Sequence, residues 1–269
     1  MKANCPIVFI HIPKTAGTTF HSILHNKYRG AVFFPNKKQK LTDIESLSDE
    51  SLNKIEVFKG HFHFGLHQKL NKPVTHITFL REPIARTISS YNHLIRKLHN
   101  EPEKAFIKEN YSLKELLTNG KVEYLDNCIT RYLSGLKDLK FGEIDKSAYE
   151  LALKNFDTYF DHFGICEKFD ESLILLKNEL NWSSTFYNKV NTADKKSYIS
   201  SFDKDTLDLL KQYNQYDIKL YKHALRKFET KINAYEKNFH KEVNRFKKQN
   251  LFLSPFRKII RYIWLLVNH

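Results

Sequence analysis

The segment FIHIPKTAGTTF, residues 9–20, constrains the fold more than any other part of the chain, because it reads as a strand, a loop and a helix in succession. The apolar run of residues 7–10 is typical of a short buried strand, which ends at Pro13. An amphipathic stretch from residue 18 to about residue 27 predicts a helix. A strand–loop–helix unit directs backbone N–H groups and the positive end of the helix at one place. We therefore expect this loop to bind a phosphate or sulfate group.

The loop does not follow the pattern of ordinary nucleotide triphosphatases. Their phosphate loop has the form G-x-x-x-x-G-K-[ST], with the lysine after the second glycine. Here Lys14 precedes Gly17, which is the only glycine of the loop. Lys14 adds a mobile cation, and Thr15, Thr18 and Thr19 add hydroxyl donors. The sequence thus predicts an anion site that differs from that of an ordinary NTPase.

The rest of the chain alternates strand and helix patterns, which is the mark of an α/β layered domain. Further strands are expected around residues 55–58, at 76–80 and within 158–169, with an excursion or short helix within 37–53. Further helices are expected at about 84–98, opened by Pro83, and at 171–180, capped by Asp170. We expect three layers with a central, mainly parallel sheet.

The positive charge of the chain is concentrated near its end. The formal charge is +14, and residues 219–269 hold 13 Lys or Arg against 3 Glu, a net of +10. The remainder therefore carries only +4, which argues against nucleic acid as a partner of the main domain. We expect a catalytic domain over residues 1–218 and a basic helical extension over residues 219–269.

Two interpretations stay open for each half of this extension. From Tyr221 to residue 246, apolar residues recur every three or four positions, which predicts one long helix with a narrow seam. The seam either packs on its own domain or forms a homodimer. The last stretch, SPFRKIIRYIWLLVNH, mixes cations with apolar residues. It either lies on an anionic membrane surface as a peripheral contact or docks as a terminal helix.

The remaining composition suggests a cytoplasmic protein without a metal centre. Three scattered cysteines are typical of reduced thiols, and no His, Cys or Asp cluster has the spacing of a metal site. Residues 2–4 lead directly into the first strand without a signal segment.

A second signal lies in FLREPIARTISSYNH, where Arg81 ends a strand and Ser89 follows eight residues later. Both side chains can reach an anion beside the first loop, since Arg has a planar fork suited to phosphate and Ser has a hydroxyl donor. Alone, the pair is equally compatible with a helix-start ion pair and a solvated hydroxyl. Together with PKTAGTT it suggests a site for two anions.

Five segments in this order resemble the carbohydrate sulfotransferase superfamily: HIPKTAGTTF, FKGHFHFGLH, FLREPIARTISSYNH, DNCITRYLSG and FGICEKFDESLILLK. The branch that they resemble contains the heparan sulfate 2-O- and 6-O-sulfotransferases and bacterial relatives. The resemblance covers about residues 5–225 and leaves the basic tail unexplained. It implies a P-loop-like fold and 3′-phosphoadenosine 5′-phosphosulfate (PAPS) as the sulfuryl donor.

The resemblance also implies roles for individual residues. The donor loop would consist of Pro13, Lys14, Thr15, Ala16, Gly17, Thr18 and Thr19. Arg81 and Ser89 would hold the 3′-phosphate, and Asn191 would belong to a variable loop over the nucleotide. The absence of the G-K-[ST] lysine then has a reason, because there are no magnesium-bound β- and γ-phosphates for it to bind.

Sulfuryl transfer needs a base for the acceptor hydroxyl and positive charge near the departing oxygen. Neutral imidazole suits the first role, and the resemblance assigns it to His61 in KGHFHFG, with His63 as the competitor. Lys14 suits the second role. Arg131 is expected to contact a substrate or to form a structural salt bridge. The expected acceptor is a hydroxyl of a glycan or glycan-like molecule.

Two other functions remain as alternatives. One is a P-loop-like nucleotide kinase, which the missing G-K-[ST] disfavours. The other is a non-enzymatic module that binds nucleic acid or membrane through the basic extension.

Overall fold

In the computed structural model, which describes residues 5–35, 40–99, 112–188, 201–235 and 238–267, five strands form one parallel sheet. The strands are β1 (Ile7–Ile10), β2 (Phe33–Phe34), β3 (Val57–Gly60), β4 (Thr75–Leu80) and β5 (His162–Ile165). Their order is β2-β3-β1-β4-β5, and every neighbouring pair is parallel. The expected α/β class is confirmed, and the described sheet is all parallel.

The register of the sheet brings three loops to one edge. Ile10 at the end of β1 pairs with Gly60 at the end of β3 and with Thr78 near the end of β4. The chain moves to one side of β1 for β2 and β3 and to the other side for β4 and β5. In open α/β sheets, ligands bind beyond the carboxyl ends of the strands where the strand order reverses. The loops after β1, β3 and β4 occupy that place.

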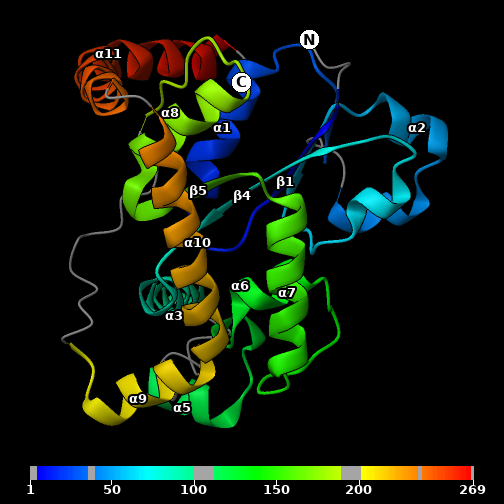
Figure 1. Ribbon diagram of the computed structural model, residues 1–269, viewed down its shortest axis with the longest axis vertical. Coiled ribbons are helices and arrows are strands. Elements are labelled where there is room, and N and C mark those ends of the chain that lie inside the picture. The colour runs from blue at the N-terminus through cyan, green and yellow to red at the C-terminus, as the bar shows by residue number, and fades with distance from the viewer. Residues whose placement is uncertain (1–4, 36–39, 100–111, 189–200, 236–237, 268–269) are drawn as a thin grey trace.

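Helices cover both faces of the sheet, which confirms the three layers (Figure 1). On one face, Phe79 of β4 packs against Phe20 of α1 (Gly17–Lys27) and Phe169 of α8 (Phe169–Glu179). On the other face, His76 of β4 contacts Tyr159 of α7 (Lys146–Tyr159). Residues 76 and 79 point to opposite faces because side chains alternate along a strand.

The other described helices before residue 214 are α2 (Asp49–Lys54), α3 (Pro83–His99), α5 (Leu113–Asn119), α6 (Cys128–Ser134) and α9 (Lys204–Tyr213). Pro83 opens α3 as predicted. The cap predicted at Asp170 is wrong, because Lys168 is the N-cap of α8. Asp170 lies inside the first turn, where its carboxylate accepts a hydrogen bond from the Tyr187 hydroxyl at 2.8 Å.

The chain after residue 214 forms two helices, so the prediction of one long helix is wrong. α10 (Gln215–Ala234) ends where Tyr235 turns to an extended backbone, and α11 (Phe239–Val267) begins four residues later. The predicted seam packs on its own domain, since Phe228 and Phe246 belong to the buried core. Within the described chain, no helix is long and apolar enough to cross a membrane.

The proposed domain boundary at residue 218 falls inside α10 and stays a prediction. A homodimer and a peripheral membrane contact also stay predictions.

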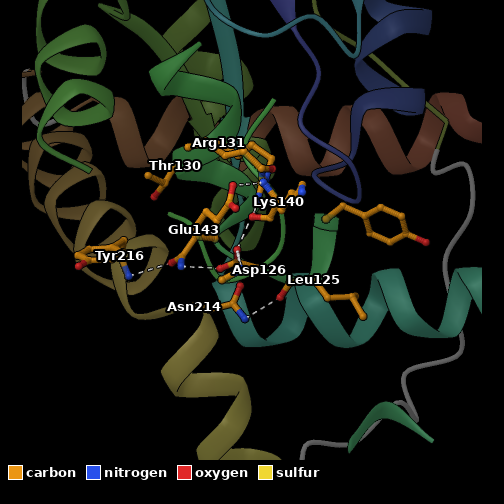
Figure 2. A network of polar contacts seen from close by, with 12 residues as sticks. Leu125, Asp126, Thr130, Arg131, Lys140, Glu143, Asn214 and Tyr216 are labelled. Carbon is orange, nitrogen blue, oxygen red and sulfur yellow. Dashed lines mark hydrogen bonds and ion pairs between the residues drawn. The ribbon is translucent and has the colours of Figure 1, made fainter. Parts of the chain in front are cut away.

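Reciprocal capping joins α6 to α10. The Asp217 carboxylate of α10 accepts hydrogen bonds from the backbone N–H groups of Ile129 and Thr130 at 2.8 and 2.7 Å. In return, the Asn127 side chain accepts from the backbone N–H groups of Tyr216 and Asp217 at 3.0 and 3.1 Å. Each helix start therefore receives the acceptor that it lacks from the other helix. Figure 2 shows the polar network around this junction.

Candidate functional site

The loop between β1 and α1 has the backbone shape of an anion site. Lys14 and Ala16 adopt the left-handed conformation, with φ of 68° and 61°. Helix α1 starts at Gly17 without a side-chain cap and without an acidic residue in its first turn. Its first N–H groups and its positive end are therefore available for an anion.

The threonine side chains of the loop differ in what they can offer. The buried Thr15 hydroxyl donates to the Ile12 carbonyl at 2.7 Å, so it is engaged inside the loop. Thr15 can offer an anion only its backbone N–H. Thr18 is exposed, whereas Thr19 is buried.

Gly17 is required for space. A Cβ atom at this position would lie 1.9 Å from Nε2 of His11, far inside any permitted contact. The His11 ring therefore occupies the volume that another residue would need. This contact joins His11, the residue that follows β1, to the first residue of α1.

Three cations gather at the loop. Nη1 of Arg81 donates to the Lys14 carbonyl at 3.2 Å, which fixes Arg81 against the loop. The pKa of Lys14 is lowered by burial first and then by the positive charges of Arg96 and Arg81. Such mutual repulsion favours a polyanionic ligand between the cations.

Arg96 is a member of this cluster that the sequence reasoning missed. It lies on α3, seven residues, or about two helical turns, after Ser89. That spacing places both residues on one face of the helix. It was the sequence signal from which Arg96 could have been predicted as a member of the cluster. Ser89 itself is half-buried on α3. Asn191 lies outside the described residues.

His61 follows β3 and contacts the backbone of His11, just before the loop that precedes α1. Its Nδ1 lies 2.6 Å from the backbone carbonyl oxygen of His11. A carbonyl only accepts, so Nδ1 carries the proton and Nε2 keeps its lone pair. The side chain reaches solvent, yet burial of the ring lowers its pKa, while the hydrogen bond to His11 opposes that shift.

His63 lies in a different environment from His61. Its ring stacks on Tyr132, with centroids 4.4 Å apart. Burial and then the charges of Lys137 and Arg131 lower its pKa to about 4, against the opposite effect of Asp138. His61 is 6.5 Å from the same Tyr132 ring, so the two histidines flank one tyrosine.

Arg131 is buried inside the fold. It pairs with Asp126 at 3.2 Å and donates to the Lys140 carbonyl at 3.2 Å (Figure 2). It also donates to the carbonyl of Leu139. The structure therefore shows the salt bridge that the sequence analysis left open, and contact with a substrate stays a prediction.

A row of imidazole rings runs from His61 into the core. The His11 ring stacks on His61 with centroids 4.4 Å apart, and His21 of α1 lies 5.0 Å from His11. Burial is the main cause that lowers the pKa of His11 to about 2 and that of His21 to about 3. Both rings are therefore neutral near pH 7 and form an uncharged support beneath His61.

Comparison with known proteins gives one family. A sequence model of the family described as galactose-3-O-sulfotransferase matches residues 2–256, nearly the whole chain. No curated protein matches the sequence significantly. The family match confirms the resemblance to carbohydrate sulfotransferases.

Proposed function

Because the chain belongs to the galactose-3-O-sulfotransferase family, a family of PAPS-dependent enzymes, we propose that it sulfates a galactose hydroxyl with His61 as the general base and Lys14 beside the leaving group. The family implies the donor and a galactose-containing acceptor. The roles of the individual residues are our proposal.

The residues of the loop fit the donor. PAPS supplies the sulfuryl group and leaves as adenosine 3′,5′-bisphosphate. Residues 13–19 would hold its 5′ end through backbone N–H groups and the start of α1. Arg81 and Ser89 would hold the 3′-phosphate, with Arg96 as a further cation. The fit rests on the uncapped helix start and on the two cations, Arg81 and Arg96, that act on Lys14.

His61 would accept the proton of the acceptor hydroxyl on Nε2. The His11 carbonyl holds the proton on Nδ1, so the lone pair faces away from that contact. The same carbonyl would stabilise the imidazolium that forms. Lys14 would counter the negative charge that develops on the departing oxygen.

The observation that carries this proposal is the 2.6 Å contact between His61 Nδ1 and the His11 carbonyl. It would hold the base next to His11, which lies two residues before the proposed donor loop of residues 13–19. The acceptor oxygen and the donor would thus meet at one place, as an in-line transfer requires.

Radiolabelled sulfate transfer to galactose-containing acceptors tests these roles. His61→Ala should lose about 10²–10⁴-fold in turnover and keep its affinity for adenosine 3′,5′-bisphosphate. His63→Ala, the matched control, should lose much less. Lys14→Ala should lose both turnover and nucleotide affinity. Full activity of His61→Ala would overturn the assignment and make His63 the first alternative.

A further inference from the structure

The turn between β4 and α3 carries Arg81, whose direction decides whether it can meet a phosphate at the donor loop. Glu82 fixes this turn from the helix side, because its carboxylate accepts hydrogen bonds from the backbone N–H groups of Ile84 and Ala85 at 3.1 and 2.6 Å. It thereby caps the start of α3. The Arg81 guanidinium donates to the Lys14 carbonyl, and no carboxylate of the described residues pairs with it. Its charge therefore stays available to a ligand.

Glu167 fixes the same turn from the neighbouring strand. β4 and β5 pair in parallel with Leu80 opposite Ile165, so residues 82 and 167 follow neighbouring strand ends by equal steps. Oε1 of Glu167 accepts the backbone N–H of Glu82 at 3.0 Å. That N–H belongs to the peptide bond between Arg81 and Glu82. One carboxylate oxygen therefore holds the backbone directly after the proposed phosphate ligand.

Tyr221 of α10 holds the other oxygen of this carboxylate. Its hydroxyl donates to Oε2 of Glu167 at 2.9 Å. Tyr221 is 9% exposed and belongs to the core, whereas Glu167 is exposed. Burial and then the charge of Glu167 raise the pKa of Tyr221, so this hydroxyl keeps its proton near pH 7. A buried ring thus restricts an exposed side chain that would otherwise sample several rotamers.

The negative charge of Glu167 lies close to Arg81, which is an unfavourable place for it beside a phosphate. Burial and then Glu167 raise the pKa of the Cys166 thiol, whereas Arg81 lowers it, so both charges act on the turn after β5. A carboxylate there weakens the attraction of Arg81 for an anion. It also favours the start of α8, since Glu167 directly precedes the N-cap residue Lys168. That effect does not require the two hydrogen bonds, which join α10 to the turn after β4.

We propose that Glu167 and Tyr221 are positioning residues for the donor, which hold the turn after β4 so that the Arg81 guanidinium faces the 3′-phosphate. This inference rests on the proposed role of Arg81 in the donor site. It gives a role to the segment FGICEKF, residues 163–169, which the proposed function leaves unused. It also makes α10 a support of the donor site.

Calorimetry with adenosine 3′,5′-bisphosphate and AMP tests this inference, because only the bisphosphate carries the 3′-phosphate. Tyr221→Phe removes one oxygen atom and keeps the buried ring, so it should fold. Its affinity for the bisphosphate should fall roughly three- to tenfold, with the affinity for AMP nearly unchanged. Glu167→Ala should lose roughly tenfold, and Glu167→Gln, which keeps an acceptor for the Glu82 N–H, should lose less. Glu171→Ala is the matched control, since this carboxylate lies in the first turn of α8 and pairs with Lys247 at 2.8 Å.

Arg81→Ala separates positioning from a general effect on the fold. In that background Tyr221→Phe should cause no further loss of affinity for the bisphosphate, because both changes act through one guanidinium. Additive losses, or equal losses for the two nucleotides, would overturn the inference and leave a structural role. A full preference for the bisphosphate in both Tyr221→Phe and Glu167→Ala would also overturn it, while the proposed donor site would stand. Equal affinities for the two nucleotides in the natural protein would instead contradict the donor assignment, and the inference would fall with it.

Discussion

At the scale of single residues, we expect the His11 ring, which stacks on His61, to influence the pH range in which His61 would act as a base. Burial holds the pKa of His61 below its ordinary value. A base works only when neutral, so activity is lost as the pH falls through this pKa, and the acidic limb of kcat/KM should lie below about pH 6.5. His11→Ala removes the ring stacked at 4.4 Å and admits water, which should raise the pKa of His61 and move the limb to higher pH.

His11→Phe is the control for this prediction, since it keeps an uncharged stacked ring and leaves the backbone carbonyl in place. Its acidic limb should stay close to that of the natural protein. The pH dependence of kcat/KM, together with an NMR titration of His61, measures the effect. Identical limbs in the natural protein and in His11→Ala would contradict it.

At this scale the sequence could predict the loop before the uncapped start of α1 and could single out Arg81, which contacts that loop, because short motifs carry both. It could not show that Thr15 turns its hydroxyl back to Ile12 or that Gly17 is needed for the His11 ring. Nor could it choose between the two interpretations of Arg131. Those facts depend on contacts that only the folded loops create.

At the scale of elements, the junction of α6 and α10 predicts a large stability effect. Asp217 is fully buried and accepts two backbone N–H groups and the Thr130 hydroxyl. Asp217→Ala would leave these donors unpaired and should lower the free energy of unfolding by about 3–5 kcal/mol, whereas Asp217→Asn should cost less.

Urea denaturation measures this effect against Asp157→Ala. Asp157 pairs with His223 and Lys227 but is exposed, so its loss should cost at most about 1 kcal/mol. Equal costs for Asp217→Ala and Asp157→Ala would show that the junction contributes little.

Four of the five strands and the helices α1, α3 and α8 were predictable because apolar runs and Pro83 mark them locally. The two-residue strand β2 and the helices α5, α6, α7 and α9 were not predicted from the sequence. The break at Tyr235 was not predictable either, since the apolar spacing of three and four continues across it into α11. The position of Asp170 was misread for a related reason. Several acidic residues near a helix start look like caps in sequence, and only the backbone shows which residue precedes the helix.

At the scale of the whole molecule, the binding of nucleotides should test the proposed donor site, through both the affinity and the stability of the fold. Adenosine 3′,5′-bisphosphate should bind roughly 10- to 150-fold more tightly than AMP, because its 3′-phosphate would meet charged donors. At about 100 times its Kd it should stabilise the fold by about 2.7 kcal/mol, seen as a rise in Tm.

Arg81→Lys keeps the charge but loses the planar fork, so it should lose much of this preference, and Ser89→Ala should lose less. Lys146→Ala is the control, since Lys146 forms an exposed pair with Glu150. Calorimetry with both nucleotides on each variant gives the ratio. Equal affinities for the two nucleotides in the natural protein would contradict the assignment of the 3′-phosphate.

The reciprocal caps between Asn127 and Asp217 also have a consequence for how the chain is made. The partners of these hydrogen bonds are 87 to 90 residues apart in the sequence. At ribosomal rates of about 5–20 residues per second, α6 leaves the exit tunnel roughly 4 to 18 s before its capping carboxylate. During that interval the start of α6 has only water to satisfy its N–H groups. The junction between α6 and α10 therefore cannot close until the last third of the chain is made, although all five strands of the sheet are complete by residue 165.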